Sequence, residues 1–322
     1  MRAIRVHETG GPETLRFENV ELPSPAPGEA RVRHRAIGLN FMDVYYRTGL
    51  YPAPKPFTPG GEAAGEIVAL GKGVKEFKIG DRVAYAARFG GYAEESNVDA
   101  GLLVKLPKAI SFETAAAAML KGLTAQYLLR QTYRVKKGDV ILVHAAAGGV
   151  GQILCQWGRS LGASVIGTVG SPEKAALAKK AGAAHTILYR EEDFASRVAS
   201  ITKGAKCHVV YDGIGKATYP GSLDCLRPFG MFACYGSSSG PIENFNFSLL
   251  GQKGSLFATR PTLFTFLADR RRLERMARDL FSVLRSGAVK VKINAPLPLA
   301  EAARAQEALE ARETTGSTVL VP

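Results

Sequence analysis

The chain has 322 residues, 46% hydrophobic and 22% charged, which is typical of a soluble globular protein with room for two domains. No apolar run reaches the roughly 18 residues of a membrane-spanning helix, which excludes such a span. The N-terminus has no signal-peptide core, so we expect a cytoplasmic protein. The formal charge of +13 permits affinity for nucleic acid, acidic surfaces or a phosphate-rich cofactor. The one tight basic run, Arg270 to Arg272, is typical of a solvated helix face.

The N-terminal part, up to about residue 120, predicts a β-rich domain. Short runs bounded by glycine and proline predict strands at residues 3–6, 15–20, 30–37, 65–70 and 82–86. Many short strands with turn residues between them indicate a compact barrel or sandwich. Residues 38–49 predict a loop that runs into a short helix.

From Ser111 onward, strands and helices alternate. Ser111 and the acid that follows predict the N-terminus of a helix. Strands are predicted at 140–143, 164–169, 185–188, 208–212, 230–235 and 254–259, with helices at 150–161, 191–202 and 219–226. One more helix is predicted between Ser171, its N-cap, and Gly182. The alternation predicts a doubly wound parallel sheet with ligands at the carboxyl ends of its strands.

The C-terminal tail does not continue this alternation. Residues 262–286 predict one long amphipathic helix or two, and residues 299–311 a further helix. Strands are predicted at 289–295 and 317–321. The four cysteines form no CxxC pair, so we expect reduced, packed thiols.

A glycine-rich turn follows the strand at 140–143. Ala146, Gly148 and Gly151 occupy the three glycine positions of a dinucleotide fingerprint, in the strand, turn and helix order that the motif requires. Small residues let the backbone approach a pyrophosphate, and the N-terminus of the helix favours an anion. An ordinary glycine-rich turn of an α/β protein is the alternative at this point.

The next turn indicates which dinucleotide fits. NAD-specific sites usually carry an acid near the end of the second strand, but here Gly170 and Ser171 follow it. Lys174 lies one helical turn further on, and Tyr189 and Arg190 follow the third strand. A 2′-phosphate would find a cation, hydrogen-bond donors and a helix dipole there, so we expect NADPH rather than NADH. Lys174 taken alone would be typical of a solvated helix lysine.

Several motifs in order carry a family resemblance over essentially the whole chain, at residues 59–71, 80–83, 144–151 and 252–261. The chain resembles the medium-chain dehydrogenase/reductase superfamily and, within it, the zinc-free quinone oxidoreductases of the zeta-crystallin-like branch. The resemblance implies an α/β fold with a GroES-like catalytic domain, residues 1–122 and 262–322. It also implies a Rossmann NADPH-binding domain, residues 123–261, with a doubly wound parallel six-stranded sheet. Homodimers would pair through the last strand of that sheet, about residues 255–259.

The resemblance also makes the absence of zinc testable residue by residue. Zinc-dependent relatives need a cysteine three residues before the position of Asp43 and a histidine just before that of Glu62. This chain has Asn40 and Gly61 there, which cannot replace a thiolate and an imidazole. The cysteines of a structural zinc lobe are also missing, and the histidines lack metal-ligand spacing. We therefore expect no metal.

Further cofactor contacts are implied by the resemblance alone. They are Phe41, Met42, Asp43, Val44 and Tyr45 at the nicotinamide end, Tyr127 on the helix that joins the domains, Gly148, Gly149 and Val150 at the pyrophosphate turn, Tyr235, Gly236, Ser237 and Ser238 after the fifth strand, Pro261, Thr262 and Leu263 after the sixth, and Arg312 in the tail. Without the resemblance, Arg312 would be interpreted as an exposed arginine at a helix end.

The implied reaction is NADPH-dependent reduction of a small-molecule quinone, which asks mainly for orientation because the cofactor carries the chemistry. Asn40 and Tyr45 are the candidate donors for developing negative charge, and Arg47 and Tyr51 are candidate substrate contacts. Tyr45 has packing as its alternative role, and no obligatory general acid is assigned. An enoyl-thioester or activated-alkene reductase is the alternative function. RNA binding is less favoured, because the chain has no RNA-binding motif.

The cofactor hypothesis predicts the effect of removing one cation. Lys174→Ala should raise the KM for NADPH much more than the KM for NADH, because only NADPH carries the 2′-phosphate. Steady-state kinetics with both cofactors measures this. Equal changes in the two KM values would mean that Lys174 does not contact the phosphate.

Overall fold

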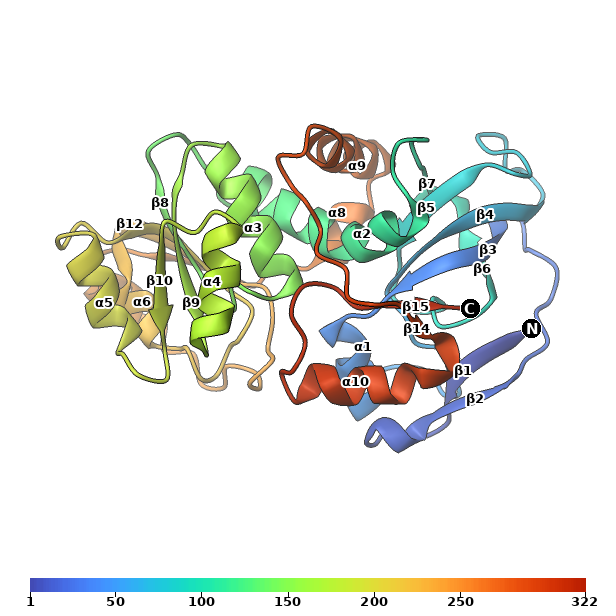
Figure 1. Ribbon diagram of the computed structural model, residues 1–322, viewed down its shortest axis with the longest axis horizontal. Coiled ribbons are helices and arrows are strands. Elements are labelled where there is room, and N and C mark those ends of the chain that lie inside the picture. Colours follow the sequence, from blue (N-terminus) through green and yellow to red (C-terminus); the bar gives the residue numbers. More distant parts are fainter. The chain divides into compact units, whose positions relative to one another are not determined.

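The computed structural model describes residues 1–322, and the chain forms two compact units (Figure 1). The first unit comprises residues 1–123, 267–285 and 291–322, and the second comprises residues 124–266 and 286–290. The tail therefore returns to the first unit after the chain has passed through the second. None of the helices combines the length and the apolar character that a membrane span requires.

The first unit is built on a seven-stranded mixed sheet. The strand order is β14-β15-β3-β4-β5-β7. Strand β6 also pairs with β3, at its N-terminal half, and β1 and β2 form a separate hairpin. The strands are β1 (Arg2–Val6), β2 (Leu15–Asn19), β3 (Glu29–Gly38), β4 (Glu62–Leu70), β5 (Arg82–Ala86), β6 (Glu95–Asp99), β7 (Val104–Lys105), β14 (Leu297–Pro298) and β15 (Val319–Val321). Because β15 pairs antiparallel with β3, the C-terminus completes the N-terminal sheet.

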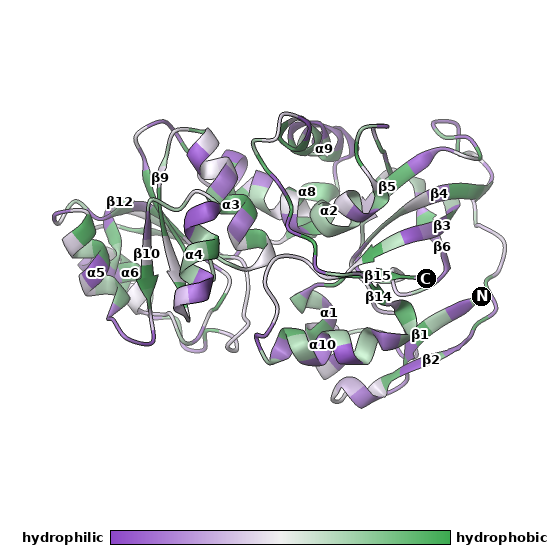
Figure 2. Cartoon of the chain, viewed as in Figure 1, coloured by the Kyte–Doolittle hydropathy of each residue, from purple (hydrophilic) through white to green (hydrophobic).

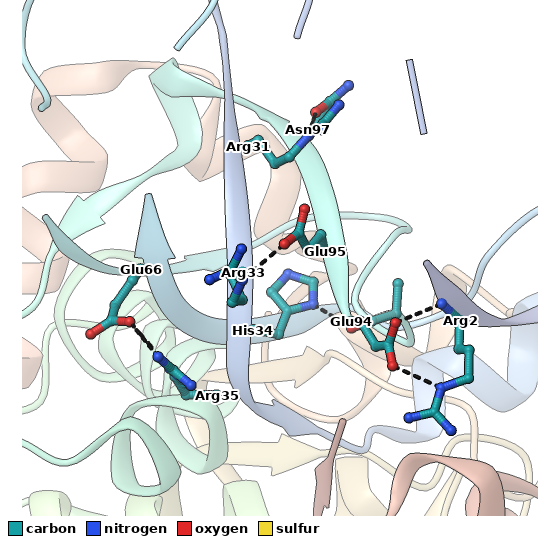
Figure 3. A network of polar contacts seen from close by, with 10 residues as sticks. Arg2, Arg31, Arg33, His34, Arg35, Glu66, Glu94, Glu95 and Asn97 are labelled. Carbon is teal, nitrogen blue, oxygen red and sulfur yellow. Dashed lines mark hydrogen bonds and ion pairs between the residues drawn. The ribbon is translucent and has the colours of Figure 1, made fainter. Parts of the chain in front are cut away.

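Strand β3 shows why this sheet has one polar and one buried face. Arg33 and Arg35 point outward and form ion pairs with Glu95 and Glu66 on the neighbouring strands, at 2.9 and 2.8 Å (Figure 3). His34, between them, points inward, where its ring nitrogens lie 2.7 Å from the Ala93 carbonyl and 2.8 Å from the Tyr85 hydroxyl. Burial lowers the pKa of His34 to about 4, so this ring is neutral at pH 7.

The helices of the first unit cover the sheet and carry the tail back to it. They are α1 (Phe41–Thr48), the first part of α2 (Phe112–Tyr127), α9 (Arg270–Arg285) and α10 (Ala302–Glu310), with short 3₁₀ turns at Pro12–Thr14, Ala100–Leu102 and Leu299–Glu301. As predicted, Ser111 caps α2, since its hydroxyl oxygen accepts a hydrogen bond from Thr114 N at 3.1 Å. Helix α9 packs closely on α2: a Cβ on Gly122 would lie only 2.4 Å from the Leu280 side chain, which would have to shift to admit it.

The second unit is a six-stranded, fully parallel sheet in the order β10-β9-β8-β11-β12-β13. Its strands are β8 (Val140–Val143), β9 (Ser164–Val169), β10 (His185–Leu188), β11 (Cys207–Asp212), β12 (Leu226–Cys234) and β13 (Phe257–Thr259). The helices are α3 (Gly149–Ser160), α4 (Pro172–Lys180), α5 (Phe194–Ile201), α6 (Gly221–Asp224), α7 (Ser248–Gln252) and α8 (Leu263–Leu267), and a π-helical turn at Leu128–Thr132 follows α2. This order confirms the predicted doubly wound sheet.

The hydropathy pattern explains why these strands lie inside. Figure 2 shows that the end of β10 is hydrophobic, where Ile187 is buried, whereas α4 mixes hydrophobic and hydrophilic residues. Leu142, Ile166, Val210 and Phe232 form one buried cluster on the central strands. All four predicted thiols are buried and free, and burial raises the pKa of Cys155 to about 12.

The structure differs from the sequence prediction mainly in short segments. The strand predicted at 289–295 is wrong: Ile293 forms only an isolated bridge, and the backbone N–H and C=O of Lys290 bond to the side chain of Gln156 instead of a strand. Of the two alternatives predicted for residues 262–286, the structure has two helices, and Asp269 caps the second by accepting from Arg272 N at 2.7 Å. The short strands β6 and β7 and the short helix α7 are not predicted by the sequence.

Candidate functional site

The glycine-rich turn lies between β8 and α3, with Gly148 as the N-cap of α3. Gly151 has no room for a side chain, since a Cβ there would lie 2.3 Å from the Ala145 carbonyl oxygen. Ala145 itself has a left-handed backbone, with φ 51°. The turn thus presents only backbone and small residues at the N-terminus of α3, which suits the approach of a pyrophosphate.

Ala146 takes the first fingerprint position because its neighbour on the next strand is a glycine. Ala146 is fully buried, and a Cβ on Gly167 of β9 would lie 2.7 Å from the Ala146 methyl carbon. The methyl group therefore fills the space that the side chain of residue 167 would otherwise take. The alanine is compatible with the fold of a dinucleotide turn.

The glycine-rich turn forms one candidate phosphate site, or cradle, and the turns after β9 and β10 form a second. Ser171 caps α4 as predicted, its hydroxyl oxygen accepting a hydrogen bond from Lys174 N at 3.3 Å. The Tyr189 hydroxyl and Arg190 Nε lie 2.8 and 3.5 Å from the place that a Cβ on Gly170 would take. The structure therefore brings these donors together beside a helix N-terminus. The acid of this turn, Glu173, is exposed in the first turn of α4, and a hydrogen bond with the Ser171 side chain lowers its pKa.

A buried polar network connects the carboxyl ends of β8, β9 and β11. The two ring nitrogens of His144 lie 2.8 Å from the Thr168 hydroxyl and 3.0 Å from that of Ser222. Ser222 in turn donates to Asp212, whose other oxygen accepts the backbone N–H groups of residues 214 and 215. Burial lowers the pKa of His144, so its neutral ring joins hydroxyl groups instead of carrying charge. The sequence predicted His144 only as a packing or surface residue.

The other predicted residues of the second unit are distributed as follows. Tyr127 is buried and its ring stacks on Phe266, with centroids 4.4 Å apart. Residues 235–238 follow β12, where a Cβ on Gly236 would lie 2.5 Å from the Gly213 carbonyl oxygen. Residues 261–263 follow β13 and begin α8. Their contacts with a cofactor stay a prediction. Arg312, in the first unit, is exposed just after α10.

In the first unit, the N-terminus of α1 is held by two buried carboxylates. Asp43 accepts hydrogen bonds at 2.9 Å from Asn40 N and from the Tyr92 hydroxyl. Glu62 accepts from Asn40 Nδ2 at 2.9 Å, from Lys121 Nζ at 2.5 Å and from the backbone N–H of residue 120 at 2.7 Å. Lys121 and Tyr92 carry no local sequence signal, because the folding of the sheet and α2 brings them here from distant positions.

This geometry changes the interpretation of Asn40. Its amide nitrogen faces two acceptors, the Glu62 carboxylate and the Gly38 carbonyl oxygen at 3.3 Å. Both amide hydrogens are therefore used within the protein, and rotating the amide would set its oxygen against the same acceptors. The structure argues against Asn40 as a donor to a developing negative charge. Tyr45 remains the candidate donor.

An aromatic group surrounds the predicted substrate residues. The ring of Tyr45 lies 5.7 Å from that of Phe41 and 5.1 Å from that of Tyr51, between centroids. Tyr45 is 8% exposed. The structure thus gathers Tyr45, Phe41 and Tyr51 at α1, and their roles toward a substrate stay predictions.

The prediction that Arg47 contacts substrate is disfavoured. Its side chain is completely buried, and Nε donates to Gln306 Oε1 at 2.7 Å while Nη1 donates to the Gly10 carbonyl at 2.8 Å. The remaining arm forms an ion pair with Glu310 of α10. Arg47 joins α1 to the C-terminal tail, so its charge is used in holding the fold.

Asp43 provides a test of this buried cluster. Burial raises the pKa of Asp43 to about 7, although the hydrogen bonds from Asn40 and Tyr92 act in the opposite direction. The folded chain thus binds this proton more tightly than the unfolded chain, and the free energy of unfolding should fall by about 2 kcal/mol from pH 5 to pH 8 on its account. Asp43→Asn should remove that decrease.

Denaturant unfolding at several pH values measures the free energy of unfolding of the wild type and of Asp43→Asn. Subtracting one from the other cancels the contributions of the other titrating groups. Asp99→Asn is the control, since Asp99 is exposed and accepts only a turn hydrogen bond from Gly101 N. A wild-type curve and an Asp43→Asn curve that run parallel would contradict the raised pKa.

Comparisons with known proteins agree with this architecture. Residues 26–108 match the family described as alcohol dehydrogenase GroES-like domain, and residues 149–276 match the family described as zinc-binding dehydrogenase. A quinone oxidoreductase of Pseudomonas aeruginosa is 53% identical, with 100% of this chain and 99% of the relative covered. The 2-haloacrylate reductase of a Burkholderia species is 44% identical, with 99% and 98% covered. The structure of Escherichia coli quinone oxidoreductase complexed with NADPH has a TM-score of 0.98 and 48% identity, with 100% of both chains covered.

The zinc in one of these descriptions does not fit the residues present. Asn40 offers the neighbouring carboxylate an N–H group, and a Cβ on Gly61 would lie 2.5 Å from the side chain of Met42. The structure contains no group of three or more histidine, cysteine, aspartate or glutamate side chains that could hold a metal ion. The donor set at this position is that of a hydrogen-bonded network. By its fold and its relatives, the chain belongs to the quinone oxidoreductase family of the medium-chain dehydrogenase/reductase superfamily.

Proposed function

We propose that the chain is an NADPH-dependent quinone reductase that works without a metal. The observation that carries this is the pair of cradles at the carboxyl ends of β8, β9 and β10, one for a pyrophosphate and one for a 2′-phosphate. The Escherichia coli relative that was solved with NADPH supports the same cofactor. Residues 1–122 and 262–322 form the catalytic domain in this proposal, and residues 123–261 bind the cofactor.

The residues of the second unit bind and orient the cofactor. Gly149 and Val150 offer backbone N–H groups to the pyrophosphate at the start of α3, while the Gly148 N–H donates to the Ala145 carbonyl oxygen and holds the turn. The donors around Gly170, from Ser171, Lys174 and Tyr189, hold the 2′-phosphate. NADPH, when bound, supplies the reducing equivalents that the quinone accepts.

The residues of the first unit orient the substrate. In this proposal Phe41 and Met42 contact the nicotinamide end, and Tyr45 and Tyr51 contact the quinone. The support is that the rings of Phe41, Tyr45 and Tyr51 form one aromatic group at α1. Tyr45 steadies negative charge on the quinone oxygen through its hydroxyl. Hydroquinones are weak acids, so the anion formed by reduction is stable enough to be protonated by water. The mechanism therefore assigns no general acid.

A substrate panel tests the function. With NADPH, the protein should reduce 1,4-benzoquinone and 9,10-phenanthrenequinone faster than crotonyl-CoA or 2-chloroacrylate, as followed by loss of the NADPH absorbance band. The 2-haloacrylate reductase among the relatives makes activated-alkene reduction the second candidate. Rapid oxidation of NADPH by an alkene with no response to either quinone would select that candidate instead.

We also propose a homodimer that forms through β13. This strand is the edge of the parallel sheet, paired only with β12, so its outer backbone groups are free to pair with a second copy. Phe257 on β13 and Phe229 near it in the sheet are 56% and 68% exposed, which is unusual for large apolar side chains.

Phe257→Glu should therefore convert the dimer to a monomer, because two carboxylates would meet across the strand pair. Light scattering after size-exclusion chromatography measures the mass. Ile79→Glu is the matched control, since Ile79 is 66% exposed but lies in the first unit. A wild-type monomer, or a Phe257→Glu dimer, would contradict the interface.

A cytoplasmic location rests on the sequence expectation, and fractionation of cells tests it. Nucleic-acid binding is not proposed as the main role. On α9, Arg270 is paired with Glu76 and Glu274.

A further inference from the structure

Lys121 is an unusual lysine, because it is buried at the centre of the network that holds α1. The side chain is 7% exposed and its ammonium lies 2.5 Å from Glu62, which is completely buried. Desolvating a lysine and a glutamate costs several kcal/mol each unless they pair well. A lysine is therefore not expected at this position for packing alone.

The Glu62 carboxylate is fully used, and each of its partners comes from a different place. Asn40, at the N-terminus of α1, and Lys121 share one oxygen, while the backbone N–H of Leu120 donates to the other. The Lys121 charge also acts on Asp43, whose second oxygen, Oδ1, has no hydrogen-bond partner. Two buried carboxylates thus face one cation.

Zinc-dependent members of the superfamily place a metal ion at the positions of Asn40 and Gly61. Here a Cβ on Gly61 would clash with Met42 and would also lie 2.9 Å from Leu120, so the space is filled by side chains. The carboxylates remain, and the positive charge on them comes from α2.

We propose that the ammonium of Lys121 is the built-in cation of this site, taking the electrostatic place of the absent metal and positioning Asn40 through Glu62. The ammonium pairs with the buried Glu62 carboxylate, and the same carboxylate oxygen accepts the hydrogen bond that orders the Asn40 amide. The Asn40 backbone then starts α1 at the point where Phe41 and Tyr45 follow. Lys121 is a positioning residue, and its effect on catalysis rests on the proposed function.

Four variants test the charge separately from the packing. Lys121→Met keeps the length of the side chain but leaves Glu62 buried without its cation, and Lys121→Arg keeps the charge. The double variant Lys121→Met with Glu62→Gln removes both charges. Lys108→Met is the control, because Lys108 is exposed in the same unit.

Thermal unfolding of the cofactor-free protein is the first measurement. Lys121→Met should lower Tm by about 5 °C or more, and the double variant should recover at least half of that loss. Lys108→Met should leave Tm unchanged. A Lys121→Met protein as stable as the wild type, or a double variant no better than the single one, would overturn the proposal. A wild-type Tm raised by equimolar zinc sulfate would overturn it too.

Kinetics of quinone reduction is the second measurement. Lys121→Met should lose about tenfold or more in kcat with a smaller change in the KM for NADPH, since the phosphate cradles lie in the second unit and α1 is proposed to contact only the nicotinamide end. Lys121→Arg should recover part of the loss. An equal change in both parameters would assign Lys121 a merely structural role.

Rescue with a small cation makes the assignment specific. Lys121→Ala should regain Tm and kcat in n-propylammonium chloride. It should not regain them in n-propanol with sodium chloride added to the same ionic strength. Equal effects of the two additives would overturn the proposal. Loss of quinone activity in the wild type, with the Tm pattern and the Tm rescue intact, would refute the proposed function and leave the cation assignment standing.

Discussion

The carboxylate of Glu62 is the interaction on which the first unit depends. It stands on β4, in the middle of the mixed sheet, and accepts hydrogen bonds from the start of α1 and from α2. Burying a charge is costly, so the structure surrounds it with donors on all sides. The same arrangement fixes where α1 begins, and with it the position of the aromatic side chains that follow. One buried charge thereby sets the geometry of a whole corner of the unit.

The second unit solves a different problem, the close approach of backbone to a charged ligand. Its strands end in turns made of glycine, alanine and serine, and buried hydrogen-bonded groups hold those turns together. His144 and Asp212 each connect loops from neighbouring strands: the neutral His144 ring bonds two hydroxyl groups, and Asp212 accepts from hydroxyl and backbone donors. These contacts define the positions of the turns that lead to the helix N-terminus.

Much of the second unit was predictable because its signals are local. The apolar runs of the strands, the Ser171 cap and the glycine-rich turn each lie within a few neighbouring residues, and the structure places them as expected. The first unit was harder to predict, because strands such as β6 carry a single apolar residue, Val98, and pair far along the chain. Arg47 and Asn40 show the same limit in the site, since burial and partners decided their roles. Neither property is visible in the order of residues.

The contact between Ala146 and Gly167 bears on how such sequences are recognised. The two residues are 21 positions apart, yet the Ala146 methyl group occupies the space that a side chain on Gly167 would need. A fingerprint that scores the first glycine alone treats alanine as a defect. Scoring the pair as one unit, large with small, would admit sequences like this one and would reject chains in which both positions carry a methyl group.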